Sequence, residues 1–444
     1  MTDLAPGTPA LDAALRGPSS RAIHLGQHEE GPALFPVAPL ITHSARLLES
    51  FDEGQALLRG ERGPNIAYQR YGNPTTLVLE AKFRALERCQ YSMAVNSGMT
   101  ASLMVFRALL GTGDHVMMLD QAFYETREQL GREAASRGIR VSWIRGATPE
   151  AFEAAYDSTA RLVYIETPTN PTLRDVDLRA LAAWCESRHC LLVVDNTLLT
   201  PLGQNPLSHG ADLTLYSLTK HLNGHGDMVG GMISTNRPDL YDKLKAVRDV
   251  DGLTLDPFSA WLAIRGLRTL PLRLQRHASN ALAVTQMLTR EYPGITWGSV
   301  WTTPHARQNG VSLQLNTGLM FIDFQDRSTA MRFVSALKVM RLAPTFGNLE
   351  SLCYCHGGFA DAEDRAFDAL AIPASLVRLS IGLEDVSDLL ADIRQALDAC
   401  GWMPFLSHLV TSPAPLPGSP RSSAARHDGA SLAATGKGSA KVHS

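Results

Sequence analysis

The chain has 444 residues, of which 45% are hydrophobic and 19% are charged, and its formal net charge at pH 7 is −3. This composition is ordinary for a soluble globular protein, and the length favours two domains over one core. A net charge this close to zero offers no electrostatic footprint for nucleic acid or for an anionic membrane surface.

No apolar run approaches the roughly 18 residues that a membrane helix needs. The first residues lack the basic start and apolar stretch of a secretory signal. The six cysteines form no CxxC pair and no regular framework, which favours reduced thiols over disulfides. We therefore expect a cytoplasmic protein, and we expect no metal in its site.

Before about Arg62 the chain contains little regular pattern, and we expect residues 1–61 to form an extended arm. Between Ser92 and Asn236, short apolar runs alternate with stretches long enough for helices. This alternation indicates a mostly parallel sheet covered by helices on both faces. The predicted strands are SMAVNS, HVMMLD, RVSWIRG, RLVYIET, CLLVVDNT, LTLYSLTK and GGMISTN, and two predicted helices are TASLMVFRALLG and LRALAAWCESRH.

The pattern changes after about Val250. A long helical stretch begins at PFSAWLAIRGL, and GLMFIDF and SLVRLSIG read as strands. The segment SDLLADIRQALDACG predicts an amphipathic helix with Ser387 as its N-cap and Gly401 as its end. We therefore expect an α/β domain over residues 62–255 and a smaller α+β domain over residues 256–410.

The last stretch of the sequence, residues 411–444, is rich in Ser, Ala, Gly and Pro and contains no aromatic residue. Such a segment cannot bury enough apolar surface to offset the entropy lost on ordering. We expect it to be a disordered tail.

In a mostly parallel sheet, ligands bind beyond the carboxyl ends of the strands, so the residues that follow each predicted strand are candidates. NSGMTAS places Ser97, Gly98 and Met99 at a strand-to-helix junction, which suits a phosphate but commonly only caps a helix. Asp195 follows the apolar run in CLLVVDNT, either as a buried carboxylate that needs a partner or as a turn residue. Lys220 ends LTLYSLTK, either as such a partner or as a solvated strand end.

Taken together, these positions predict one ligand, pyridoxal 5′-phosphate (PLP). The Ser97–Met99 turn and the hydroxyl groups of Ser217 and Thr219 would bind its phosphate. Asp195 would pair with the basic ring nitrogen, and Lys220 would condense with the aldehyde.

Five motifs resemble those of the PLP-dependent enzymes of Cys and Met metabolism, the group of cystathionine β-lyase, γ-lyase, γ-synthase and methionine γ-lyase. The likeness extends from about Ile23 to about Cys400 and is carried by YQRYGNPT, ETPTNPT, SLTKHLNGHGD, RGLRTL and LVRLSIGLED. The resemblance implies the fold-type I PLP-dependent transferase fold. This is an α/β fold with a mostly parallel sheet, helices on both faces and a smaller C-terminal α+β domain.

The resemblance also implies a role for each candidate residue. Lys220 would be the Schiff-base lysine and would move protons at the substrate, and Asp195 would bind the ring nitrogen. Tyr124 would lie over the ring and assist proton transfer. The phosphate would be held by Gly98, Met99, Ser217 and Thr219, and the amino-acid substrate by Asn170, Thr345 and Arg378.

Tyr68 and Arg70 carry a further implication, because in the family this loop reaches the phosphate of a neighbouring subunit. The chain would then be a homodimer at minimum, or a homotetramer built from such dimers. Two segments depart from the family pattern: YETR, which begins at Tyr124, and Gly226, which stands where serine is usual.

The leading functional hypothesis is elimination at a C–S bond of cystathionine or a related amino acid, which gives a thiol, ammonia and a 2-oxo acid. The alternative is γ-replacement on an O-acyl-homoserine. A third hypothesis is a PLP-binding homologue without activity. No residue of the sequence decides between elimination and replacement.

Overall fold

The computed structural model describes residues 15, 17–25, 37–61, 63–359 and 372–404. All of them fall within one compact unit, which ends at Phe405. The predicted disordered tail, residues 411–444, lies outside the described residues. No helix in the described ranges is long and apolar enough to cross a membrane.

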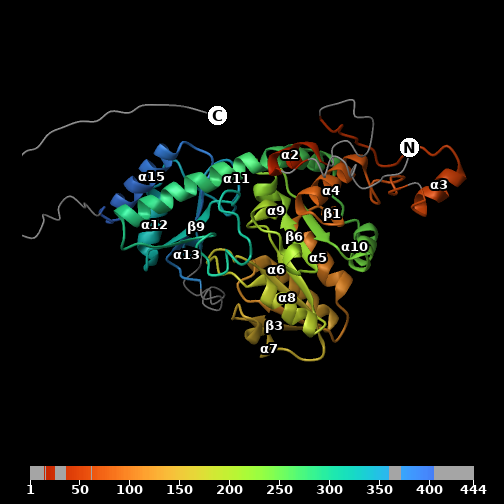
Figure 1. Ribbon diagram of the computed structural model, residues 1–444, viewed down its shortest axis with the longest axis horizontal. Helices are drawn as coiled ribbons and strands as arrows, with labels where there is room; N and C mark the ends of the chain where they lie inside the picture. Colours follow the sequence, from red (N-terminus) through yellow and green to blue (C-terminus); the bar gives the residue numbers. More distant parts are fainter. Residues whose placement is uncertain (1–14, 16, 26–36, 62, 360–371, 405–444) are drawn as a thin grey trace, which may run out of the picture. The chain divides into compact units, whose positions relative to one another are not determined.

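The larger sheet has seven strands in the order β1-β7-β6-β5-β4-β2-β3 (Figure 1). The strands from β2 to β6 pair in parallel, whereas β7 is antiparallel to both β1 and β6. The predicted mostly parallel sheet is therefore confirmed. The strands are β1 (Tyr91–Val95), β2 (His115–Leu119), β3 (Arg140–Ile144), β4 (Ala160–Glu166), β5 (Leu191–Asp195), β6 (Leu213–Ser217) and β7 (Gly231–Thr235).

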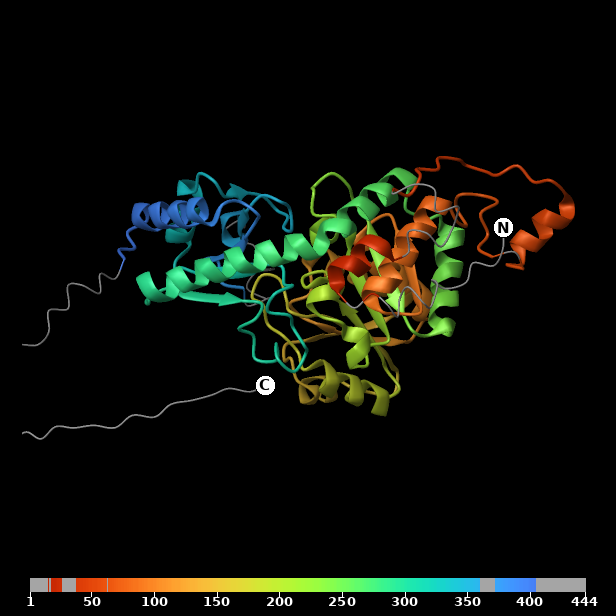
Figure 2. The ribbon, with the colours of Figure 1, turned by 45° about the horizontal axis from the view of Figure 1, so that its top comes forward.

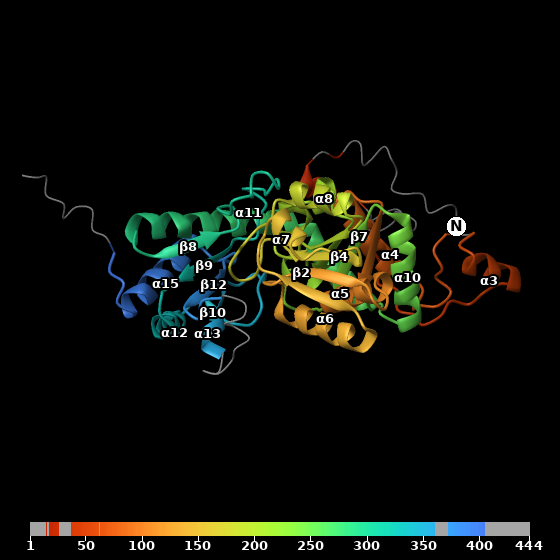
Figure 3. The same cartoon turned by 90° about the horizontal axis from the view of Figure 1, so that it is seen from below.

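Helices cover both faces of this sheet, as the unbroken apolar strands predict. Val116 and Met118 of β2 belong to the same apolar cluster as Phe106 of α5, whereas Met117 and Leu119 belong to the cluster of Leu181 of α8. Figure 3 shows α5 and α6 on one side of the sheet and α8 on the other. The helical segments are α4 (Pro74–Glu87), α5 (Gly98–Leu109), α6 (Tyr124–Arg137), α7 (Pro149–Glu153), α8 (Leu178–Ser187), α9 (Thr200–Gly203), η1 (Pro206–His209), η2 (Leu218–Leu222) and α10 (Pro238–Asp251).

The C-terminal part contains a five-stranded sheet in the order β10-β11-β12-β9-β8. The helix α11 (Pro257–Glu291) packs on η2 and on helix α15, and Figure 2 follows it along its length. The other elements are β8 (Thr296–Ser299), β9 (Leu319–Asp323), α12 (Arg327–Ala336), β10 (Arg341–Leu342), β11 (Leu352–Cys355), α13 (His356–Phe359), β12 (Leu376–Ser380) and α15 (Val386–Ala399).

Two local predictions are wrong. The expected arm contains two helices, α2 (Pro18–His24) and α3 (Phe51–Leu58). The helix α15 begins at Val386 after the N-cap Asp385, so Ser387 lies inside the helix rather than at its cap. The predicted end of α15 is confirmed, because Gly401 follows with a left-handed φ of +92° that suits glycine.

Candidate active site

Lys220 leaves the edge of the sheet in a single π-helical turn. Asp195 ends β5, Ser217 ends the neighbouring β6, and η2 follows at once with Lys220 at its centre. The backbone of Lys220 is not helical, with φ −91° and ψ −141°. Arg273 of α11 holds the end of this turn, because its guanidinium donates to the carbonyl oxygens of His221 (2.7 Å) and Leu222 (3.1 Å).

The ammonium group of Lys220 contacts the C-terminal part of the chain. Its Nζ donates to Thr345 Oγ1 at 2.9 Å and lies 4.9 Å from the centre of the Phe346 ring. Burial lowers the pKa of Lys220 to about 8, and the charge of Arg378 adds to this effect. A substantial fraction of the lysine is therefore neutral near physiological pH, and only the neutral amine can act as a nucleophile or a base.

Arg378 presents a buried guanidinium beside this lysine. The side chain lies on β12 and is only 5% exposed. Its terminal nitrogens donate to Asn170 Oδ1 (3.2 Å) and to the carbonyl oxygen of Thr345 (2.7 Å). Its Nε is buried and has no hydrogen-bond partner among the described residues. Because an unpaired buried donor is unfavourable, this guanidinium is prepared to bind a carboxylate.

Two carboxyl groups lie side by side where β4 and β5 end, since Glu166 and Asp195 are register partners. Asp195 Oδ1 accepts from the backbone N–H of Thr197 at 2.9 Å, and burial raises the pKa of Asp195. Glu166 Oε2 accepts from the backbone N–H of Phe123 at 2.9 Å. Burial raises the pKa of Glu166 strongly, and the nearby charge of Asp195 raises it further. A basic nitrogen facing Asp195 would compensate for the burial of its charge.

Sequence reasoning missed Glu166, although a signal was present. Glu166 follows the apolar run of RLVYIET in the same way that Asp195 follows the run before VVDNT. It missed Phe346 as well, and no local pattern marks that residue.

The predicted phosphate turn is formed by residues from β6 and α5. Ser97 is the N-cap of α5, and its Oγ accepts from the backbone N–H of Thr100 at 3.0 Å. A Cβ atom on Gly98 would lie 3.0 Å from Ser217 Cβ, so a larger residue would push these two segments slightly apart. Thr219 Oγ1 accepts from the backbone N–H of Gly230 at 3.2 Å, which fixes the hydroxyl beside this turn.

Tyr124 is the first residue of α6, and its side chain is 51% exposed. The same helix contacts the phosphate turn, because Gln129 Nε2 donates to the carbonyl oxygen of Met99 at 3.1 Å. The structure therefore gathers the predicted phosphate-binding residues at one end of the large sheet, with Tyr124 on a helix that is bound to them.

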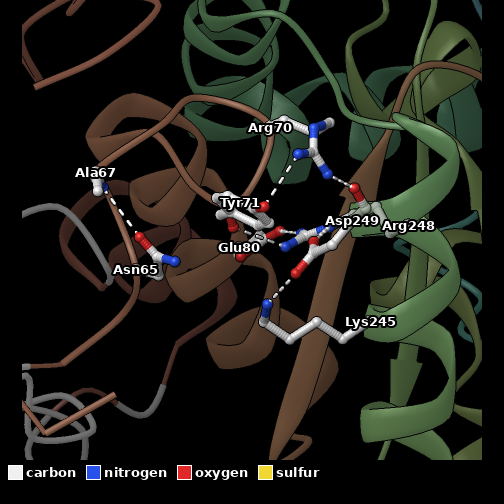
Figure 4. A network of polar contacts seen from close by, with 8 residues as sticks. All are labelled: Asn65, Ala67, Arg70, Tyr71, Glu80, Lys245, Arg248 and Asp249. Carbon is white, nitrogen blue, oxygen red and sulfur yellow. Dashed lines mark hydrogen bonds and ion pairs between the residues drawn. The ribbon is translucent and has the colours of Figure 1, made fainter. Parts of the chain in front are cut away.

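Arg70 lies in a different environment, beside Glu80 of α4 and Asp249 of α10 (Figure 4), and the ring of Tyr68 packs near Tyr71 and Arg70. Arg70 donates to the carbonyl oxygen of Asp249 and to Tyr71 Oη, the latter at 3.0 Å. Within the described chain, no recorded hydrogen bond or ion pair joins Tyr68 or Arg70 to Lys220.

A buried ion pair supports the loop that contains Arg70 and Tyr71, here called the Arg70 loop. Arg248 donates to Glu80 Oε1 at 3.0 Å and to the carbonyl oxygen of Tyr71 at 3.1 Å, and Asp249 pairs with Arg248 and Lys245 (Figure 4). The Arg70 loop is thus fixed to α10.

The residues around Lys220 fit the ligand predicted from the sequence. They offer a partly neutral amine, a carboxylate at the end of the neighbouring strand, hydroxyl groups beside a helix N-terminus, and a guanidinium nitrogen without a hydrogen-bond partner among the described residues. These groups match the aldehyde, the ring nitrogen and the phosphate of PLP and the carboxylate of an amino acid.

Comparisons with known proteins agree with this arrangement. Residues 19–398 match the family described as Cys/Met metabolism PLP-dependent enzyme. The cystathionine gamma-lyase of Dictyostelium discoideum is 38% identical over 75% of this chain and 87% of its own length. The cystathionine gamma-synthase of Mycobacterium tuberculosis is 35% identical over 86% of this chain and 97% of its own length. The crystal structure of cystathionine gamma-lyase from Lactobacillus plantarum complexed with L-serine superposes with a TM-score of 0.78 at 28% identity, covering 87% of this chain and 99% of that one.

Proposed function

Since the chain belongs to the family of PLP-dependent enzymes of Cys/Met metabolism, we propose that it eliminates a thiol from cystathionine or a related amino acid. PLP is its cofactor, an amino acid is its substrate, and C–S bonds are its point of action. The observation that carries the proposal is the pairing of a partly neutral Lys220 with the buried Arg378, both bonded to Thr345.

PLP supplies an electron-accepting ring and an aldehyde that condenses with amines. In the proposed site, Lys220 Nζ takes the proton from the substrate Cα and returns it to the departing group. Arg378 binds the α-carboxylate through its unpaired Nε side, and Asn170 orients the guanidinium. Asp195 would pair with the ring nitrogen of the cofactor, and Tyr124 at the start of α6 would assist proton transfer.

The phosphate of the cofactor is assigned to the helix-capping turn and the strand end beside it. Ser217 and Thr219 offer hydroxyl groups, while Gly98 and Met99 offer backbone N–H groups at the N-terminus of α5. Thr345 accepts a hydrogen bond from Lys220 Nζ. We further propose residues 62–255 as the cofactor-binding domain and residues 256–410 as the smaller domain.

γ-Replacement on an O-acyl-homoserine is the second candidate, because relatives named cystathionine gamma-synthase match nearly their whole length. Steady-state assays of the purified holoenzyme separate the two reactions. Release of a 2-oxo acid from cystathionine without any added nucleophile supports elimination. Formation of cystathionine from O-acyl-homoserine plus cysteine, with no 2-oxo acid from cystathionine alone, would overturn it.

We also propose that the active unit is a homodimer or a tetramer of dimers, with Tyr68 and Arg70 serving the neighbouring subunit. Two observations support this proposal. Arg70 is anchored to α10 rather than to its own Lys220. Apolar side chains of the N-terminal region are exposed, with Leu47 and Phe51 both at 93%, as expected for a surface that another copy covers.

All six cysteines are free thiols, which supports a cytoplasmic location.

A further inference from the structure

The ring of Phe346 contacts both cationic side chains of the candidate site. Its centre lies 4.9 Å from Lys220 Nζ and 5.1 Å from Arg378 Cζ. The side chain of Phe346 is only 6% exposed, so these contacts are largely shielded from water. The negative face of an aromatic ring attracts a cation at such distances, and the attraction grows when the cation is desolvated.

These two cations need such compensation. Arg378 and Lys220 repel each other, and neither belongs to an ion pair within the described part of the chain. The carboxylate of Glu125 acts on Lys220 only through space. The buried carboxyl group of Glu166, whose pKa is raised well above its usual range, forms no ion pair with Arg378 among the described residues. The ring of Phe346 contacts both cations, and the ring of Tyr354 lies 5.5 Å from Arg378 Cζ as well.

The backbone around Phe346 is held by the same elements that carry the cations. Thr345 accepts from the lysine through its side chain and from the arginine through its carbonyl oxygen. The backbone N–H of Gly347 donates to Ser380 Oγ at 3.0 Å on β12. Gly347 has φ +87°, and a Cβ atom there would lie 2.6 Å from the backbone nitrogen of His221. The loop is thus packed tightly between η2 and β12.

Apolar side chains hold the ring from other sides. Phe346 belongs to a small buried cluster with Leu173, Leu198, Leu199 and Leu319, and its ring centre lies 5.8 Å from that of His221. Because interiors are close-packed, the ring cannot turn away from the two cations without opening a cavity.

We propose that Phe346 is a positioning residue that holds Lys220 and Arg378 at a fixed separation. This fixed separation allows one substrate to bind its carboxylate to Arg378 while its Cα proton faces Lys220 Nζ. The inference rests on the proposed function, because it takes Arg378 as the group that binds the substrate carboxylate.

The test compares Phe346→Leu with Phe324→Leu in the holoenzyme. Phe324 is a matched control, since it is 3% exposed in the same part of the chain but its ring pairs with Phe333 instead of a cation. Calorimetry measures the Kd of butyrate, a monocarboxylate without amine or sulfur, and steady-state assays measure kcat and KM for cystathionine. Thermal unfolding monitors the fold, and Phe346→Met replaces the leucine variant if that variant does not fold.

We expect Phe346→Leu to weaken butyrate binding and to raise KM by about fivefold, within the range of a partly desolvated cation–ring contact. The acid limb of the kcat profile should move to lower pH, because the ammonium form of Lys220 loses a stabilising contact. Phe324→Leu should lower Tm without changing Kd or the pH profile.

Arg378→Ala distinguishes failure of the proposed carboxylate site from failure of the positioning role of Phe346. If Arg378→Ala leaves the Kd of butyrate unchanged, the proposed function is wrong in its assignment of the carboxylate site. If Arg378→Ala weakens butyrate binding but Phe346→Leu binds it like the wild type with an unshifted pH profile, the positioning role is overturned.

Discussion

A Cβ atom on Gly226 would lie 2.9 Å from Asn348 Nδ2, so a side chain at position 226 would require the amide group of Asn348 to shift. Gly226 also has φ +68°, in the left-handed region that side-chain-bearing residues rarely adopt. Together the two facts account for glycine at the position where the resembling motif has serine.

Gly226→Ser should therefore lower the free energy of unfolding by about 1–3 kcal/mol, as strained backbone positions do. Part of this loss should disappear in an Asn348→Ala background, because the steric conflict is then removed. Gly113→Ser is the control, since Gly113 has φ +87° but open space around its Cβ position. Denaturant unfolding that finds equal losses at positions 226 and 113 would contradict the steric explanation.

Glu87 should make stability depend on pH. Its buried carboxyl accepts from Tyr216 Oη (2.6 Å) and Thr214 Oγ1 (2.9 Å), and burial raises its pKa from 4.5 to about 8. The folded protein thus keeps a proton that the unfolded chain releases, so this contribution to stability is complete below pH 4.5 and is lost as pH rises through about 8.

Glu87→Gln should remove that loss, because glutamine stays neutral at every pH. Between pH 5 and pH 9, the free energy of unfolding of the wild type should fall by up to several kcal/mol relative to the variant. The exposed Glu186→Gln on α8 serves as control. Parallel pH curves for the wild type and Glu87→Gln would rule out this role.

Glu166 should act as a neutral hydrogen-bond acceptor. It accepts from the backbone N–H of Phe123, directly before Tyr124, and burial beside Asp195 raises its pKa well above the usual range. Glu166→Gln keeps an acceptor oxygen and should hold kcat/KM within about threefold. Glu166→Ala removes the acceptor and should lower kcat/KM about tenfold, as the loss of a buried partner does. Equal damage in both variants would show that the charge of Glu166 is needed.

Lys220→Ala should lower kcat by at least about 10²- to 10⁴-fold, the usual contribution of a positioned acid–base group. Circular dichroism should remain that of the wild type. Lys243→Ala, an exposed lysine on α10, provides the comparison. An active Lys220→Ala enzyme would refute the proposed mechanism.

A mixture of two inactive variants tests the shared site. If Arg70 serves the neighbouring subunit, co-expressed Arg70→Ala and Lys220→Ala chains should form hybrid dimers with one intact site each. Random pairing then restores about a quarter of the wild-type activity, although each variant alone is inactive. Complementation that fails in purified hybrids would place Arg70 in the site of its own subunit.

The strands and the central site could be predicted from the sequence because their signals are local. Apolar runs mark the strands, and the residues after each run mark the ligand-binding edge. This places Asp195 at the end of β5 and Lys220 in the turn that follows the neighbouring β6. The start of α3 also has a local signal, a serine followed three residues later by a glutamate. Ser50 Oγ accepts from the backbone N–H of Glu53, and this capping pattern could have revealed the helix.

The remaining features depend on contacts between distant residues. Phe346 reads as an ordinary apolar residue until the fold brings its ring to Lys220 and Arg378. The N-cap of α15 is Asp385, whose side chain makes no capping hydrogen bond. The choice of Asp385 over Ser387 therefore depends on how the chain enters the helix, which the local sequence does not show. The conflict at Gly226 depends on the amide of Asn348, which no short motif contains.

The clamp that Arg273 places on η2 limits how Lys220 can move. With the carbonyl oxygens of His221 and Leu222 bound by a buried guanidinium, the main chain of the turn is held and only the methylene groups of the lysine remain free to rotate. Side-chain rotations are faster than collective main-chain rearrangements. Movement of the amine is therefore confined to the arc of one side chain and needs no rearrangement of the sheet edge.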